Sequence, residues 1–214
     1  NFGAGMITVE SISFTAAARN MGALEGNDPT KGLQFRNEEK PRDRYVTDDE
    51  MARLVAAASP KLGTIARFIE LTGMRQGDAL RLRLSDLDDE GFTYWNSKSK
   101  KQQGLEWSPE LVAVVDDAKR LWRRFGREWL FEGKPRGKLH KRGYGPYTPS
   151  GLRALWRVAR AKAGLPDVRL HDLRAKSASD AGTLQEASER LGHSDERVTA
   201  KHYRRRVKRV KPSR

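Results

Sequence analysis

The chain has 214 residues, 37% of them hydrophobic, which is enough for one compact domain of ordinary size and a remnant of a second. It contains no cysteine, and this excludes disulfides, thiolate catalysis and cysteine-based zinc sites. A net charge of +14 and a pI near 10.2 favour a polyanionic partner, and nucleic acid is the first candidate. No uncharged apolar run reaches the roughly 18 residues of a membrane span, so a cytoplasmic protein without membrane contact is expected.

The N-terminal stretch is expected to be separate from the rest of the chain. Residues 8–21 are typical of a single helix, and the polar stretch 36–44 is typical of a linker. A domain boundary near residue 42 follows from this pattern. We therefore interpret residues 1–42 as the remnant of an N-terminal domain plus linker, and residues 43–214 as the main domain with a basic tail.

Helix starts and stops are well marked beyond the linker. Two capping boxes and two cap residues that precede a proline predict four helix N-termini. They are at Thr47, Ser108, Thr148 and Thr183. Helices of about fifteen residues are expected after the two proline-containing starts. Gly73 and Gly192 are expected to end helices, and Arg75 to open a further one.

One hairpin interrupts the helices. Residues 92–95 and 105–107 are strand-like, and the polar residues 96–104 between them predict a long basic tip. The predicted fold class is therefore mainly α with a small antiparallel β-sheet, an α+β arrangement.

Basic residues gather at three places: the hairpin tip, the loop around residue 138, and the C-terminus. Residues 201–214 hold eight lysines and arginines and no acidic residue. This distribution favours a nucleic-acid contact over a membrane surface or a solvated tail. The candidate DNA-binding residues are Lys100, Lys101, Lys138, Lys141, Arg142, Lys201, Arg204, Arg205 and Arg206.

Several residues suit phosphodiester chemistry through a protein-bound phosphate ester. Arg75 and Arg174 could clamp one phosphate, because a guanidinium stays charged and donates paired hydrogen bonds to phosphate oxygens. Tyr203 is a candidate nucleophile, although a phenol is almost fully protonated at neutral pH and needs a base and cationic neighbours. A surface arginine or a packed tyrosine would explain each residue structurally.

Histidines, a lysine and an aspartate complete the candidate set. His171 lies one helical turn from Arg174, and His193 follows a helix-ending glycine. Lys98, in the hairpin tip, could protonate a leaving oxygen. Asp78 lies three residues after Arg75, so its carboxylate could hold that guanidinium. Solvated or structural roles are the alternatives for these residues as well.

These motifs together resemble the tyrosine recombinases, a family that includes the phage integrases. The segments TGMRQGDALRLRLSDLD, HDLR, LGH and VTAKHY stand in the family's order, and the match covers residues 43–206. The resemblance implies a site-specific DNA recombinase that cleaves and rejoins strands through a 3′-phosphotyrosine, without metal or ATP. No cofactor is expected.

The resemblance also implies a role for each site residue. The tyrosine attacks the scissile phosphate, the arginines hold it, the histidines assist proton transfer, the lysine protonates the leaving 5′ oxygen, and the aspartate supports the site. The implied catalytic residues are Arg75, Lys98, His171, Arg174, His193 and Tyr203, with Asp78 behind them. The lysine segment lacks the glycine that commonly follows the catalytic lysine, so Lys100 is an alternative to Lys98.

The implied partner is double-stranded DNA with attachment-type sites. The resemblance implies a homotetramer on DNA and a monomer when free, with a host DNA-bending factor or an excisionase as further partners. Residues 1–42 resemble only the last helix of the family's core-DNA-binding domain. The gene is expected to belong to a phage or a bacterial host.

Three other functions compete with this interpretation. A type IB topoisomerase would use the same tyrosine chemistry to relax one duplex, and a basic DNA-binding protein would use no chemistry at all. A metal nuclease could use Asp86, Asp88 and Asp89, although these residues are expected to form the turn into the hairpin.

Overall fold

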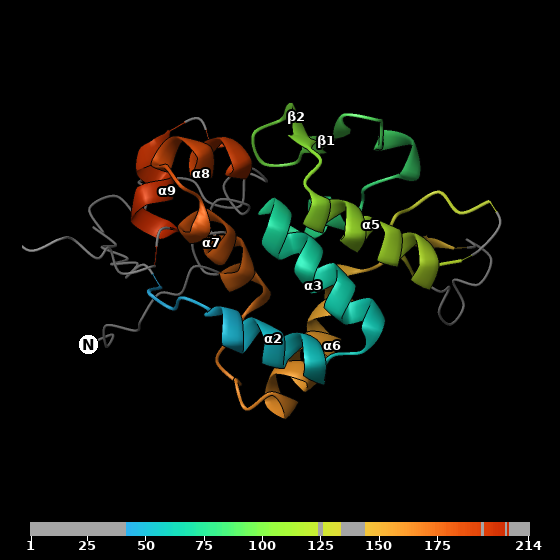
Figure 1. Ribbon diagram of the computed structural model, residues 1–214, viewed down its shortest axis with the longest axis horizontal. Helices are drawn as coiled ribbons and strands as arrows, with labels where there is room; N and C mark the ends of the chain where they lie inside the picture. Colours follow the sequence, from blue (N-terminus) through green and yellow to red (C-terminus); the bar gives the residue numbers. More distant parts are fainter. Residues whose placement is uncertain (1–41, 124–125, 134–143, 194, 204, 206–214) are drawn as a thin grey trace, which may run out of the picture. The chain divides into compact units, whose positions relative to one another are not determined.

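The fold of the main domain is mostly helical. The computed structural model describes residues 42–123, 126–133, 144–193, 195–203 and 205. The elements are α2 (Asp48–Ala57), α3 (Pro60–Thr72), α4 (Gln76–Ala79), the 3₁₀ turn η1 (Leu84–Asp86), β1 (Gly91–Asn96), β2 (Lys101–Glu106), α5 (Pro109–Leu121), β3 (Glu132–Gly133), β4 (Gly145–Pro146), α6 (Pro149–Lys162), α7 (Leu170–Asp180), α8 (Leu184–Leu191) and α9 (Glu196–His202) (Figure 1). Both sheets are antiparallel pairs, β1–β2 and β3–β4. The predicted fold class is confirmed.

Some predictions fall outside the described residues. They are the opening helix at residues 8–21 and the candidate DNA contacts Lys138, Lys141, Arg142, Arg204 and Arg206. The domain boundary near residue 42 stays a prediction for the same reason. Among the described residues, no helix is long and apolar enough to cross a membrane.

The predicted helix starts are confirmed at all four positions. The side chains of Thr47, Ser108, Thr148 and Thr183 each accept a hydrogen bond from a backbone N–H in the first turn of their helix. The helices after the two proline-containing starts have 13 and 14 residues. Gly73 and Gly192 end α3 and α8 with φ of 63° and 62°, the left-handed conformation that glycine adopts without strain. The helix expected after Arg75 is the single turn α4.

The hairpin is longer, and its tip shorter, than predicted. Strand β2 begins at Lys101 and not at Leu105, so only residues 97–100 form the tip. The added residues are polar, but their backbones pair with β1, where Gln103 lies opposite Tyr94. Hydrophobic alternation does not reveal such a strand, because backbone pairing and side-chain hydrogen bonds stabilise it. The turn before β1 is as expected, since Asp88 Oδ1 accepts hydrogen bonds from the amides of Glu90 and Gly91.

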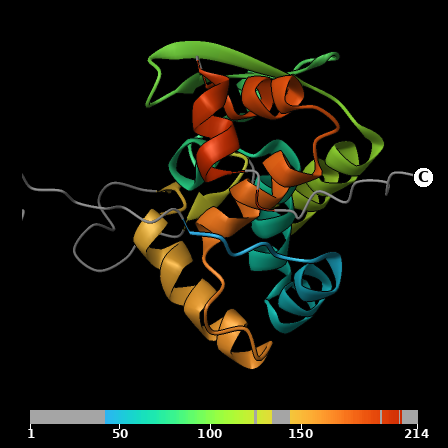
Figure 2. The same ribbon diagram turned by 90° about the vertical axis from the view of Figure 1, so that its left-hand side faces the viewer.

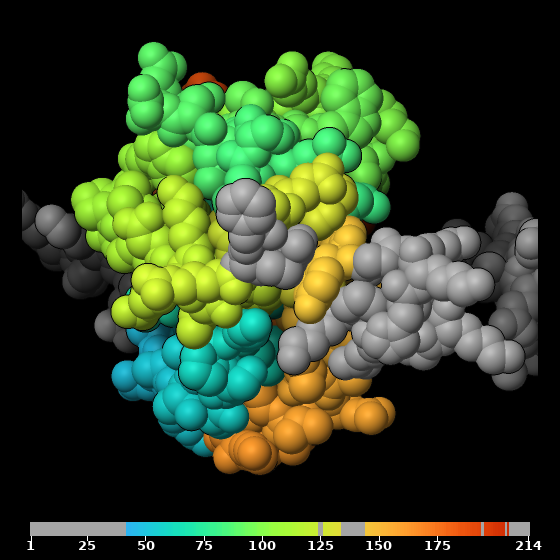
Figure 3. Space-filling model, turned by 90° about the vertical axis from the view of Figure 1, so that its right-hand side faces the viewer, coloured from blue at the N-terminus to red at the C-terminus, as the bar shows by residue number. Residues whose placement is uncertain are grey.

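Helix α3 lies at the centre of the domain and packs against α2, α5 and α7. Helix α8 packs against α7, α9 packs against α8, and this part of the domain lies beside the β1–β2 hairpin (Figure 2). The face in Figure 3 shows the hairpin region at one end, α5 below it, and α2 and α3 at the other end. The phenyl ring of Phe68 on α3 is 0% exposed and packs against two other rings, Phe92 on β1 and Phe131 just before β3. Its centroid is 5.7 Å from that of Phe92 and 5.2 Å from that of Phe131.

Truncation of Phe68 should therefore destabilise the whole domain. We expect Phe68→Ala to lower the free energy of unfolding by about 3–5 kcal/mol, since it removes a fully buried ring and leaves a cavity. Urea unfolding followed by circular dichroism measures this change. The matched control Arg67→Ala, at an exposed position of the same helix, should stay within about 0.5 kcal/mol of the parent protein. A loss below about 1 kcal/mol for Phe68→Ala would contradict the central role of α3.

Candidate active site

The guanidinium of Arg174 is buried at the meeting point of three helices. Its residue is 1% exposed on α7. Nη1 donates to the carbonyl of Gly73, which ends α3, and Nη2 donates to the carbonyl of Leu191, the last residue of α8, at 2.8 Å. Burial, followed by the nearby charge of Arg75, lowers the pKa of Arg174, but an arginine side chain stays protonated in proteins. The two carbonyls that accept these hydrogen bonds carry no net charge, so they do not neutralise the positive charge of Arg174.

Arg75 is the N-cap residue of α4 and reaches the hairpin. Its Nη1 donates to Asn96 Oδ1 at 2.7 Å. The same oxygen accepts hydrogen bonds from the backbone N–H groups of Lys98 and Ser99, each at 3.2 Å. Asn96 thus orients both the arginine and the hairpin tip. Apart from its position at the end of a strand, nothing in the sequence pointed to Asn96.

The expected contact between Asp78 and Arg75 is not formed. Among the described residues, Asp78 Oδ1 pairs with Arg81 Nη2 at 3.1 Å, and Oδ2 accepts from the amide of Ser97 at 3.5 Å. Residues three apart on a helix can meet, but Arg75 precedes α4 with an extended backbone, so its side chain leaves in another direction. Asp78 therefore supports the hairpin tip and does not hold Arg75 directly.

A cavity of about 770 Å³ opens beside the two arginines. His171, Arg75 and Arg174 line it, and four further arginines continue the lining along α6 and the start of α7. These are Arg153, Arg157, Arg160 and Arg169. None of the lining residues in the described part of the chain is acidic. Such a cavity attracts an extended anion.

Both histidines lie against the ring of Tyr203. The ring centroids of His171 and His193 are 5.4 Å and 5.0 Å from that of Tyr203. The guanidinium carbon of Arg174 is 5.5 Å from the same centroid. The structure therefore places three of the predicted catalytic residues around the phenol of a fourth, Tyr203.

The hydrogen bonds of His193 define its protonation state. Its Nε2 is 3.3 Å from Arg174 Nη2, and its Nδ1 is 2.8 Å from Thr199 Oγ1. Since arginine only donates, Nε2 must accept and Nδ1 must carry the proton. Burial, followed by the charges of Arg174 and Arg75, lowers the pKa of His193 to about 4, which agrees with a neutral ring.

His171 is also held neutral. Protein packed around the ring, followed by the charges of Arg174 and Arg205, lowers its pKa. Within the described residues its ring nitrogens make no hydrogen bond, so they are available to accept a proton. Thr199, which contacts His193, lies one turn before Tyr203 on α9, and this i,i+4 spacing is the sequence signal that could have identified it.

The two candidate lysines of the hairpin tip differ in their surroundings. The positive charge of Lys98 contributes to lowering the pKa of His193, after burial and the charges of Arg174 and Arg75. Lys100 lines a separate cavity of about 730 Å³, together with Asp78 and Arg81. It also has φ of 55°, a conformation that suits glycine. Lys100 thus has a left-handed backbone conformation that a glycine would adopt without strain.

The hairpin is docked on the C-terminal end of α8. Gln103 Nε2 donates to the carbonyls of Glu189 and Arg190 at 2.9 Å and 3.0 Å. Its Oε1 accepts from Asn96 Nδ2 at 3.0 Å. Gly192 lies directly against this pair: a Cβ there would come within 2.2 Å of Gln103 Oε1. Gln103 is a second residue that the sequence did not single out.

The candidate DNA contacts differ in their exposure. Lys100, Lys101 and Lys201 are exposed. Arg205 is not, because its side chain is 6% exposed and forms an ion pair with Asp172. A buried carboxylate thus binds the Arg205 guanidinium in this structure, and the expected contact of Arg205 with DNA stays a prediction.

No group of three histidine or carboxylate side chains suited to a metal ion occurs among the described residues. Of the three aspartates considered for a metal nuclease, Asp88 is engaged in the turn before β1. Asp86 accepts a hydrogen bond from the amide of Arg83 at 2.8 Å. These carboxylates therefore have local structural roles.

Comparison with known proteins identifies the family. The sequence pattern of the phage integrase family matches residues 44–209, and the chain belongs to this family. It is 27% identical over 192 residues to the integrase of Escherichia phage 186, covering 85% of this chain and 50% of that protein. The chain therefore spans about half the length of that relative.

Solved structures show the same fold. A lambda integrase dimer bound to a COC′ core site matches with a TM-score of 0.73 and 19% identity, over 94% of this chain and 61% of that chain. The catalytic domain of bacteriophage HP1 integrase matches with a TM-score of 0.50 and 26% identity, over 72% and 83% of the two chains. The mostly helical architecture is thus the one found in this family.

The lowered histidine pKa values predict a pH dependence of stability. In the folded protein the pKa of His193 is about 4, against 6.5 ordinarily, so below about pH 6.5 the unfolded chain binds protons that the folded protein does not. The free energy of unfolding should therefore fall as the pH falls from about 7 to 5. Urea unfolding across this range measures the slope.

The variant His193→Gln should show a shallower slope, because it removes one of the groups that resist protonation. Arg67→Ala, which leaves both histidines in place, should keep the slope of the parent protein. Equal slopes for His193→Gln and the parent would contradict the assignment of a neutral, protonation-resistant His193.

Proposed function

We propose that the chain is the catalytic part of a site-specific DNA recombinase of the integrase type. It cleaves and rejoins DNA strands through a 3′-phosphotyrosine, without metal or ATP. The observation that carries this proposal is the buried Arg174, held by neutral carbonyls beside Arg75 and 5.5 Å from the ring of Tyr203. Two adjacent cations that share no carboxylate suit a phosphodiester and favour its more highly charged transition state.

The proposed reaction begins with attack of the Tyr203 phenolic oxygen on the scissile phosphorus. As this bond forms, the bond from phosphorus to the 5′ oxygen breaks, and a 3′-phosphotyrosine results. His171 accepts the phenol proton, because it is neutral and its ring nitrogens are available. Lys98 gives a proton to the 5′ oxygen. The reverse reaction with another strand's 5′ hydroxyl completes the exchange, since the ester conserves the bond.

His193 has a different proposed role from His171. Arg174 and Thr199 already engage its two ring nitrogens. It therefore orients Arg174 in the free protein. Once a bound phosphate accepts the hydrogen bonds of the Arg174 guanidinium, the His193 ring can turn and donate a hydrogen bond to a non-bridging phosphate oxygen. Asp78 supports the site indirectly, through the amide of Ser97 in the hairpin tip.

Double-stranded DNA is the proposed substrate. Arg153 and Arg157 are exposed on α6 and line the same cavity as Arg75 and Arg174, so they extend the positive surface beyond the scissile phosphate. Lys100, Lys101 and Lys201 are exposed and add to this surface. Neither Arg153 nor Arg157 stood out in the sequence, because helix α6 carries basic residues on several faces.

We further propose a homotetramer on attachment-type DNA sites, in a bacterial cytoplasm and encoded by a phage or its host. A lambda integrase tetramer has been solved bound to a Holliday junction, which supports an assembly of this kind. Residues 1–42 are proposed to belong to a DNA-binding domain. A host DNA-bending factor or an excisionase would set the direction of the reaction.

The tyrosine step can be tested with nicked suicide duplexes whose core comes from the junctions of the element that encodes the chain. We expect a covalent protein–DNA adduct that resists denaturation, forms equally well in EDTA, and is absent for Tyr203→Phe. The phenylalanine variant should still bind the duplex. An adduct with Tyr203→Phe, or an adduct that EDTA abolishes, would overturn the proposal. Relaxation of supercoiled plasmid without a core site would point to a topoisomerase.

The two tip lysines make a second prediction. Lys98→Ala should slow single-turnover cleavage by about 10²–10⁴-fold, the usual contribution of a general acid. Replacing the bridging 5′ oxygen of the substrate with sulfur should restore most of the rate, because a thiolate leaves without a proton. The matched variant Lys100→Ala should show neither the large loss nor the rescue. The reverse pattern would assign the acid to Lys100.

A further inference from the structure

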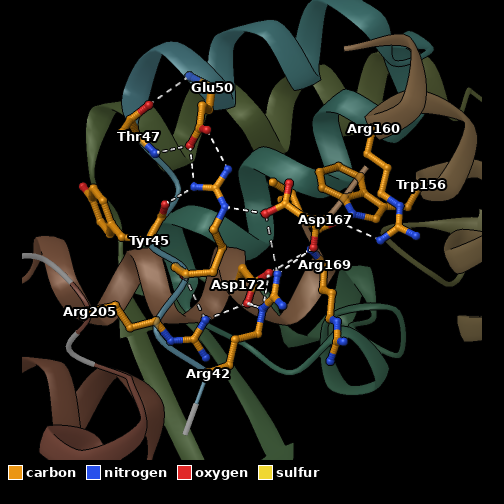
Figure 4. A network of polar contacts seen from close by, with 12 residues as sticks. Arg42, Tyr45, Thr47, Glu50, Trp156, Arg160, Asp167, Arg169, Asp172 and Arg205 are labelled. Carbon is orange, nitrogen blue, oxygen red and sulfur yellow. Dashed lines mark hydrogen bonds and ion pairs between the residues drawn. The ribbon is translucent and has the colours of Figure 1, made fainter. Parts of the chain in front are cut away.

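A buried carboxylate lies directly beside the catalytic residues of α7. Asp172 follows His171 and is 1% exposed. Its Oδ1 accepts hydrogen bonds from Arg205 Nη1 at 2.6 Å and from Arg42 Nε at 3.1 Å (Figure 4). Its Oδ2 accepts from the backbone N–H of Arg169 at 2.8 Å. Asp172 therefore joins the start of α7, the start of the described domain, and the segment just after Tyr203.

The segment after Tyr203 is fastened to α7 at a second point. Ser179 Oγ donates to the carbonyl of Tyr203 at 2.8 Å and accepts from the backbone N–H of Arg205, also at 2.8 Å. Asp172 and Ser179 are seven residues apart, about two helical turns, so they share one face of α7. The neighbouring face carries His171 and Arg174. One helix thus holds both the proposed phosphate-binding groups and the anchors of the tyrosine segment.

Helix α9 alone is a weak support for the tyrosine. It has seven residues, and Tyr203 is its C-cap residue. A helix of this length has little stability of its own. The bonds to Asp172 and Ser179 therefore add to the packing of α9 on α8 in holding the tyrosine segment in place. Because the side chain of Arg205 is only 6% exposed, neutralising Asp172 leaves the charge of that guanidinium without its carboxylate partner.

We propose that Asp172 is a positioning residue: through Arg205 it holds Tyr203 of the same chain against the helix that binds the scissile phosphate. The inference rests on the proposed function. It assigns to Arg205 a role in placing the nucleophile instead of a DNA contact. A displacement of about 1 Å at a reacting atom can cost 10²-fold in rate, so a loosened tyrosine segment would slow cleavage without weakening DNA binding.

The test compares Asp172→Asn, Arg205→Gln and the double variant in single-turnover cleavage of the nicked suicide duplex. Each single variant should slow adduct formation by about 10- to 100-fold. The double variant should be no slower than the slower single variant, because both changes break the same contact. The Kd for the duplex, measured on a Tyr203→Phe background, should not change.

A substrate with a bridging 5′ sulfur distinguishes a defect in positioning the tyrosine from a defect in protonating the leaving group. A bridging 5′ sulfur, which should rescue Lys98→Ala, should not rescue Asp172→Asn or Arg205→Gln, since their defect lies at the nucleophile. Arg205→Lys should recover part of the rate, because it keeps the charge. If Asp172→Asn does not fold, Arg205→Gln and Arg205→Lys still decide the question, since neither alters the hydrogen bond that Asp172 accepts from the backbone N–H of Arg169.

Two matched controls exclude general effects. Arg42→Gln removes the other cation from the same carboxylate but does not touch the tyrosine segment, so cleavage should stay within about fivefold of the parent rate. Asp117→Asn neutralises an exposed carboxylate that pairs with Arg120 on α5, and should leave the rate unchanged.

The outcomes distinguish the two proposals. If the parent protein forms no adduct, the proposed function fails. If it does form one, three results would each overturn the positioning role: parent-like rates for the single variants, losses that multiply in the double variant, or an equal loss for Arg42→Gln.

Discussion

The domain is organised around the buried positive charge of Arg174. A buried ion normally needs a partner of opposite sign, because its desolvation is costly. Here two backbone carbonyls, those of Gly73 and Leu191, receive its hydrogen bonds. These carbonyls are available because α3 and α8 end at that point, where the last carbonyls of a helix lack intrahelical partners. The ends of two helices therefore solvate a cation and leave its charge available to a bound anion.

Other charged side chains of α7 are also buried, but they are paired with groups of opposite charge. On its other side Lys176 is 1% exposed, and carboxylates surround it: Asp48 and Asp180, the latter at 2.7 Å. Asp172 is likewise matched by arginines. Charges with a structural role on this helix are thus neutralised by neighbours, whereas Arg174 is not. The contrast along one helix separates the groups that build the fold from the groups that act on a substrate.

The sequence predicted what local chemistry determines and missed what tertiary packing determines. Helix caps such as Thr47 and Thr183, and stops such as Gly73, depend on a few neighbouring residues, and the structure confirmed them. Tyr203 and the two histidines were identified by their order in a motif, and the structure brings them together.

Asn96 and Gln103 escaped notice because single polar residues carry no periodic signal, and their partners Arg75 and α8 are distant in the sequence. The ion pair of Arg205 escaped notice for a related reason. A run of basic residues does not show which member a buried carboxylate will bind, since its partner Asp172 lies 33 residues away.

The docking of the β1–β2 hairpin on α8 has a mechanical consequence. Gln103 bonds the last carbonyls of α8, and Gly192 lies against Gln103 with no room for a side chain between them. A displacement of the hairpin would therefore also displace the end of α8 and the adjoining His193. The position of the hairpin tip, which carries Lys98, and the position of His193 are consequently coupled.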